Sequence, residues 1–157
     1  MRVGFTGHQN LPPEFVSKIR HELWEQLRGD ATGLTGLSSL AEGADQIFAS
    51  TILSSGGALE VVIPSAGYQA TFSEEALDGY KSLLSKASRV HQLPFNEPSE
   101  EAFFAAGKYV VDNSDRMIAV WDGEKAAGLG GTGDIVQYAR DRGFNVTIIW
   151  PKDVVRD

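Results

Sequence analysis

The sequence contains no cysteine, only three histidines and no long hydrophobic run. The absence of cysteine excludes disulfide bonds, thiolate metal ligands and a cysteine nucleophile, and it fits a reducing compartment. Three scattered histidines without an HExxH pattern argue against a zinc site. No apolar run approaches the about 20 residues needed to cross a bilayer, and the N-terminal MRVGFTGHQN does not resemble a signal peptide. We therefore expect a cytoplasmic protein with no membrane partner and no protein-held metal.

Positive charge is also scarce, because 14 basic residues face 21 acidic ones and the formal net charge is −7. A protein that binds nucleic acid without sequence preference needs a basic surface that displaces counterions from the phosphates. No part of this chain is basic, which disfavours a nucleic-acid partner. A phosphate pocket remains compatible with the composition, since backbone amides at helix N-termini bind phosphate without lysine.

What the chain does have is a regular alternation of short apolar runs and longer amphipathic segments. At 157 residues and 42% hydrophobic content it fits a single domain spanning 1–157. Strands are predicted at 3–6, 32–38, 59–63, 89–93, 117–121 and 146–150, with Pro64 and Pro151 ending the third and the last. Helices are predicted to begin near 12, at 45, 73 and 99, and to cover 132–142. The pattern predicts an α/β fold: a Rossmann-like, doubly wound, mostly parallel sheet of about six strands with helices on both faces.

Ligands of open parallel sheets bind beyond the carboxyl ends of the strands, and three segments place unusual residues there. The first, after strand 3–6, contains Thr6, Gly7 and His8. Glycine lets the backbone approach a ligand closely, and Thr6 and His8 can donate hydrogen bonds to it. From the residues alone a plain polar turn explains this segment equally well, and His8 can be a ligand contact, an acid–base group or an idle loop residue.

The second segment runs from Ser38 to Asp45 and leads into the second predicted helix. The small Gly43 keeps the start of that helix open, so that its free N–H groups can face an anion. For Glu42 we predict contact with ribose, metal coordination or catalysis, and for Asp45 capping of the helix. The alternative is that both carboxylates simply favour the positive end of the helix dipole.

The third segment follows the most apolar strand and contains Asp122 and the cluster Gly130, Gly131, Thr132 and Gly133. Glycines cost roughly 1 kcal/mol each in a helix, and a phosphate held by the amides of this cluster would account for them. Neither GxGxxG nor a Walker motif is present. A tight strand-to-helix turn is the competing interpretation.

These segments together resemble the SLOG superfamily, which includes DNA-processing protein A, the YpsA-like proteins and the LOG cytokinin-activating enzymes. The resemblance rests on five groups of residues, which are 4–8, 36–38 together with 41–45, 62–64, 114–115 together with 119–123, and 130–134. It is closest to small stand-alone YpsA-like members and spans nearly the whole chain. It implies a Rossmann-like nucleotide-binding fold, a homodimer, and a ligand at the glycine-rich turns.

The leading hypothesis is therefore a protein that binds or senses a nucleotide or nucleotide-derived phosphorylated small molecule. In this hypothesis Gly130 to Gly133 hold the phosphate, and Ser38 and Glu42 contact the ribose. The alternative is a nucleotide N-glycosidase related to the LOG enzymes, with Glu42 as the catalytic carboxylate. The chain departs from the LOG pattern PGGxGTxxE at Leu129 and Asp134, among other positions, which favours binding over hydrolysis. No cofactor is assigned apart from the nucleotide ligand, and Mg²⁺ stays open.

Overall fold

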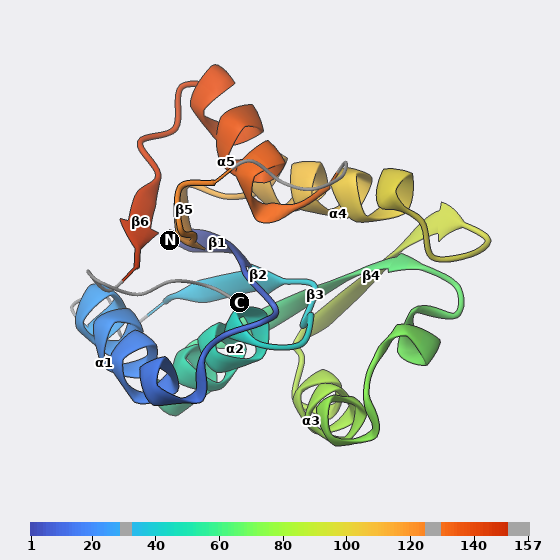
Figure 1. Cartoon of the computed structure of the whole chain (residues 1–157), viewed down its shortest axis with the longest axis horizontal. Helices are drawn as coiled ribbons and strands as arrows, with labels where there is room; N and C mark the ends of the chain where they lie inside the picture. Colours follow the sequence, from blue (N-terminus) through green and yellow to red (C-terminus); the bar gives the residue numbers. More distant parts are fainter. Residues whose placement is uncertain (29–32, 125–129, 151–157) are drawn as a thin grey trace.

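A computed structural model describes residues 1–28, 33–124 and 130–150 as a sheet flanked by helices on both faces (Figure 1). The strands are β1 (Arg2–Gly7), β2 (Thr35–Ser38), β3 (Ala58–Ser65), β4 (Arg89–Phe95), β5 (Arg116–Val120) and β6 (Thr147–Ile149). The α-helices are α1 (Val16–Leu27), α2 (Ala44–Ser54), α3 (Glu74–Ser85), α4 (Glu100–Asp112) and α5 (Thr132–Asp141). Two 3₁₀ turns are also described, η1 (Pro13–Phe15) and η3 (Tyr68–Thr71).

The strand order is β4-β3-β2-β1-β5-β6, and every strand pairing is parallel. The chain moves outward from β1 to β4 with α1, α2 and α3 on one face, then returns through α4 to β5 on the other side of β1 (Figure 1). The expected α/β class and the six-stranded, doubly wound sheet are confirmed. Strand order reverses between β1 and β5, which is where such sheets bind ligands.

The core lies in two layers, one on each face of the sheet, because the strands are apolar on both faces. One apolar stripe of α1 faces the core, since Ile19, Leu23 and Leu27 are fully buried in the cluster that includes residues of β1 and α2. Val110, Val111, Ile135 and Val136 of α4 and α5 close the opposite face. Within the described residues, no helix is both long enough and apolar enough to span a membrane.

The prediction that Pro64 ends the third strand is wrong, because β3 continues through Pro64 to Ser65. A proline cannot donate to the sheet ladder and is tolerated at irregularities. The β3–β4 register shifts between Ile63 and Ser65, which leaves the proline without a required partner. The strand at 89–93 extends to Phe95, and it lies at the sheet edge with a largely exposed pattern. That exposure explains why its sequence carries few apolar residues.

Candidate functional site

The first and third predicted segments meet where the strand order reverses. Gly7 ends β1 opposite Val120, the last residue of β5. Beyond that pair the chain continues into His8 on one side and into Trp121 and Asp122 on the other. Helix α1, which follows β1, and helices α2 and α5 all begin at this edge (Figure 1).

His8 connects these loops through both its backbone and its side chain. Its amide donates to the carbonyl oxygen of Val120 at 3.1 Å, and its carbonyl oxygen accepts from the amide of Ala44 at 3.2 Å. Its Nε2 lies 3.2 Å from the Asp122 amide nitrogen and 3.1 Å from Asp122 Oδ1. Trp150 packs its ring edge-on to the imidazole at a centroid distance of 5.5 Å. The structure thus brings the predicted residues His8 and Asp122 into direct contact.

Asp45 does not cap α2, and the prediction of that role is wrong. Gly43 is the N-cap, and it makes no side-chain capping bond. The Asp45 carboxylate instead turns back to the preceding loop, where it accepts hydrogen bonds from the Ser38 hydroxyl and from the backbone of Ser39 and Ala41. Burial raises the pKa of Asp45 to about 7, and those hydrogen bonds oppose the rise.

Ser38 lies inside the loop rather than on its surface. Its side chain is fully buried, and its Oγ donates to Asp45 at 3.0 Å and accepts from the Leu40 amide at 2.9 Å. Leu40 is held at φ 56°, a left-handed conformation that leucine rarely adopts. Ser38 therefore shapes the loop between β2 and α2, and its predicted ribose contact remains a prediction.

Glu42 and Thr6 are half-buried at the same edge of the sheet. Glu42 Oε1 accepts a long hydrogen bond of 3.4 Å from the amide of Ser73, the residue before α3. Glu42 is therefore linked to the start of α3.

Gly43 is required by the contact between two loops. Its φ is 92°, and a Cβ atom there would overlap the carbonyl oxygen of Gln9. The loop after β1 therefore packs directly on the start of α2, which only glycine permits.

The start of α5 holds the described part of the glycine cluster, while Gly128 and Leu129 fall outside the described residues. Gly130 has φ 88°, and a Cβ atom there would lie 2.9 Å from the Phe104 amide nitrogen of α4. Its amide donates to Asp134 Oδ2 at 3.0 Å. Close packing against α4 therefore accounts for Gly130. Gly131 is the N-cap without a side-chain capping bond, and Thr132 opens the helix, largely buried.

Some helix starts at this edge carry a side-chain cap and others do not. Ser73 and Ser99 cap α3 and α4, with Oγ accepting from Ala76 and Ala102 respectively. The helices α2 and α5 start at glycines without a side-chain acceptor. The helix α1, which continues from the 3₁₀ turn η1, has no side-chain cap either. First-turn N–H groups have no partner inside a helix. The first turns of α2 and α5 therefore lack side-chain caps next to β1 and β5, between which the strand order reverses.

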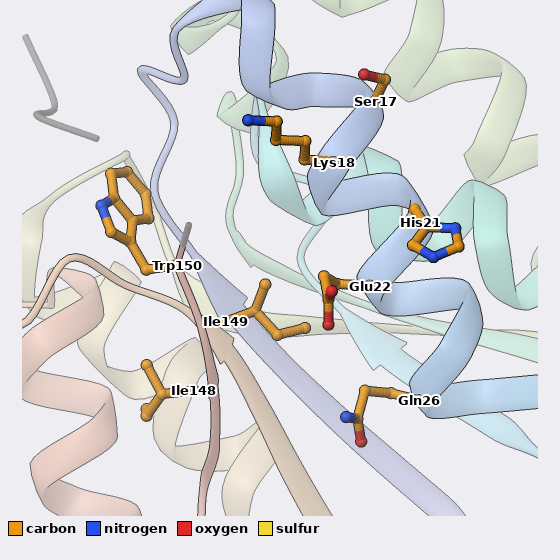
Figure 2. Close-up of a pocket in the computed structure, with 8 residues that line it drawn as sticks. All are labelled: Ser17, Lys18, His21, Glu22, Gln26, Ile148, Ile149 and Trp150. Carbon is orange, nitrogen blue, oxygen red and sulfur yellow. The ribbon is translucent and has the colours of Figure 1, made fainter. Parts of the chain in front are cut away.

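Two hollows of the described surface lie beside α1. One of about 500 Å³ separates α1 from β6, and another of about 570 Å³ borders α1 and α2. Figure 2 shows Trp150 on one side of the first hollow and Lys18, His21, Glu22 and Gln26 on the other. Trp150 thus both lines this hollow and contacts the His8 ring. No group of three or more His, Asp or Glu side chains suited to a metal ion occurs among the residues described.

A charged cluster that the sequence did not reveal lies near the opposite edge. Arg2 makes two hydrogen bonds to Glu60, at 2.7 and 3.1 Å, and His91 Nε2 lies 3.2 Å from Glu60 Oε1. The Arg2 guanidinium lowers the pKa of Glu60, although burial opposes this effect. The cluster joins β1, β3 and β4. Its residues are 58 and 31 positions apart, so no local motif could indicate it.

No protein-family model matches the chain, and no curated protein matches its sequence. Solved structures do match. DNA processing protein A from Streptococcus pneumoniae superposes with a TM-score of 0.70 and 18% identity, covering 98% of this chain and 51% of that one. The chain shares the fold of DNA processing protein A. The Helicobacter pylori protein of the same name, described with a single-stranded DNA binding mode, gives a TM-score of 0.71 and 16% identity, covering 100% of this chain and 68% of that one.

The protein TM1055 also matches, with a TM-score of 0.58 and 16% identity, covering 92% of this chain and 71% of that one. These likenesses confirm the fold that the resemblance to the SLOG superfamily implies. The chain spans about half the length of the Streptococcus pneumoniae DNA processing protein A. At these identities the matches establish the fold alone.

Proposed function

We propose that the chain binds a phosphorylated, nucleotide-like small molecule at the carboxyl ends of β1 and β5. The observation that carries the proposal is the pair of glycine helix starts, at Gly43 and Gly131, that have no side-chain cap, whereas α3 and α4 are capped by serines. Free N–H groups and the positive end of the helix dipole favour a phosphate. Both starts flank the reversal of strand order, where ligands of this fold class bind.

Thermal-shift screening of nucleoside mono-, di- and triphosphates tests the proposal. A ligand at about 100 times its dissociation constant stabilises the folded state by about 2.7 kcal/mol, which is readily measured. Stabilisation by at least one nucleotide and none by the matching nucleoside would support a phosphate-dependent site. A panel without any stabilisation would contradict the proposal.

A variant pair locates the phosphate. Gly131 has φ −72° and ψ 172°, a conformation that any residue adopts. Gly131→Asp supplies a side-chain cap and a negative charge, so it should stabilise the unliganded protein by about 1 kcal/mol and abolish nucleotide binding. Gly131→Ala supplies neither and serves as the control. Retained binding in the Asp variant would place the phosphate elsewhere.

Hydrolysis of the nucleotide's N-glycosidic bond is the alternative function. Chromatography of each thermal-shift mixture would detect the released base. If base appears, Glu42→Gln should abolish its release, and unchanged release would remove Glu42 from the mechanism. Binding without base release would support a binding or sensing role.

Single-stranded DNA carries the same phosphate groups, and it is bound by the Helicobacter pylori protein that shares this fold. The net charge of −7 opposes a long contact with a phosphate backbone. We therefore expect a thymidine oligonucleotide to bind no more tightly than a mononucleotide. Much tighter binding of the oligonucleotide would replace the small-molecule proposal. The homodimer and the cytoplasmic location stay predictions, of which light scattering tests the first.

A further inference from the structure

The His8 imidazole faces a hydrogen-bond donor and an acceptor that belong to the same residue. Its Nε2 is 3.2 Å from the Asp122 amide nitrogen and 3.1 Å from Asp122 Oδ1. An amide N–H only donates, and an ionised carboxylate only accepts. When Nε2 carries no proton, it accepts a hydrogen bond from the Asp122 amide. When Nε2 carries a proton, it donates a hydrogen bond to the Asp122 carboxylate. The position of one proton therefore selects between two hydrogen bonds to the loop after β5.

Among the described residues of these loops, the charges are mainly negative. Asp122 and Glu124 follow β5, Glu42 precedes α2, and Asp134 lies in the first turn of α5. Asp45 adds a negative charge only above about pH 7, the value to which burial raises its pKa. The described loop segments 6–10, 38–45, 121–124 and 130–134 contain no lysine or arginine. Lys18 of α1 lines the hollow that Trp150 borders (Figure 2). Within those segments, His8 is the residue whose charge can change from 0 to +1 near neutral pH.

We propose that His8 takes up a proton when a phosphate dianion binds between the starts of α2 and α5, an inference that rests on the proposed function. With neutral His8 the pair carries the −1 charge of Asp122, which repels phosphate. With imidazolium the pair is neutral. The two side chains are only 7% and 11% exposed, so solvent screens this change weakly. The ligand class is a phosphate monoester dianion, such as a nucleoside 5′-monophosphate, or inorganic phosphate.

The backbone contacts of His8 connect the proton to both helix starts. Its carbonyl oxygen accepts from Ala44, the first residue of α2, and its side chain contacts the loop that leads to α5. A change of hydrogen bond at Nε2 therefore acts on the segments that would surround the phosphate.

Histidine NMR on the wild-type protein tests the inference with inorganic phosphate and adenosine 5′-monophosphate as probes. Only three histidines are present, so single substitutions of His21 and His91 assign all ring signals. We expect either probe to raise the midpoint of the His8 titration by about one pH unit, which corresponds to tenfold preference for the protonated form. Sulfate is the control, because it stays a dianion over the whole pH range of the titration. A change in the His8 midpoint with sulfate therefore cannot come from protonation of the added anion. The signals of His21 and His91 should not respond.

Amide signals from the same sample distinguish two failures. Movement of the Gly43, Gly131 and Gly133 amides with an unchanged His8 midpoint would overturn the proton uptake and leave the phosphate site intact. No movement of either would overturn both. A second measurement uses His8→Gln, which keeps a donor and an acceptor but does not titrate. At low pH only the wild-type protein can gain affinity by protonating His8. The nucleotide affinity of His8→Gln, divided by that of the wild type, should therefore fall about tenfold from high to low pH. A ratio that does not change with pH would contradict the inference.

Discussion

At the scale of single residues, Asp45 shows how a carboxylate can organise a site without facing it. Its side chain accepts hydrogen bonds from Ser38 and from the backbone of Ser39 and Ala41, and it is almost fully removed from solvent. These bonds hold the loop that carries Leu40 in a left-handed conformation. The loop in turn leads to Glu42 and Gly43, so the shape of the candidate site depends on a buried acid.

This burial predicts an unusual dependence of stability on pH. The pKa of Asp45 is raised from 3.8 to about 7, so between these values the folded state keeps a proton that the unfolded state loses. The contribution of Asp45 to the free energy of unfolding should therefore fall as pH rises through this window, by about 4 kcal/mol in total. Asp45→Asn cannot ionise and should remove that fall. Urea unfolding between about pH 4 and pH 8 measures the difference.

Asp78→Asn is the matched control, because Asp78 is exposed on α3. Its curve should run parallel to that of the wild type. If the Asp45→Asn curve also ran parallel to the wild type, Asp45 would be ionised in the folded state throughout, and the cause of the predicted slope would be wrong.

The sequence indicated which residues gather at the site better than what each one does. Short polar and glycine-containing segments after apolar strands correctly placed His8 and Asp122 at one edge, although 114 positions separate them. The roles of Ser38 and Asp45 were not predictable, because their partners are each other and loop amides. Burial of a polar side chain within a loop leaves no periodic pattern.

At the scale of elements, the candidate site depends on loops that pack against one another. The loop after β1 lies on the start of α2 at Gly43, and the start of α5 lies on α4 at Gly130. The strands themselves followed from apolar runs, except at β4, where an exposed edge needs few apolar residues. The predicted end of β3 at Pro64 was wrong because a shift in the β3–β4 register accommodates the proline, and that shift depends on the neighbouring strand.

Gly43→Ala tests the contact between the first two loops. Gly43 and Gly56 both have positive φ, 92° and 87°, but only at Gly43 would a Cβ atom meet another loop. Gly56→Ala should therefore cost only the backbone strain, about 1–2 kcal/mol. Gly43→Ala should cost more and should weaken nucleotide binding, because the loops must separate. Urea unfolding and thermal shift measure both effects. Equal costs at the two positions would contradict the packed arrangement of the loops.

At the scale of the whole molecule, an acidic chain carries a fold that solved DNA-processing proteins share. The doubly wound order places β1 and β5 side by side and brings two uncapped helix starts to one edge. In the proposed function, phosphate affinity would come from backbone amides and helix dipoles rather than from a basic surface. The alternation of strands and helices predicted the topology class, whereas the capping differences needed the structure.

This origin of affinity predicts a weak dependence of nucleotide binding on salt. Added salt screens the repulsion between the anionic chain and the ligand as well as the attraction at the helix starts. Adenosine 5′-monophosphate affinity should change by less than about threefold between low and physiological salt. A protein with several lysine or arginine contacts to a phosphate backbone loses about a thousandfold or more. A steep loss in isothermal titration would indicate a basic contact surface and contradict the proposed site.

The most direct test of the phosphate site is an amide NMR map of the wild-type protein titrated with adenosine 5′-monophosphate. We predict that the largest shifts fall on the first turns of α2 and α5, at Asp45, Gln46, Thr132 and Gly133. The serine-capped starts of α3 and α4 should shift little. Shifts concentrated instead around Lys18, Glu22 and Ile149, beside the hollow between α1 and β6, or no shifts from any nucleotide, would contradict the site at the ends of β1 and β5.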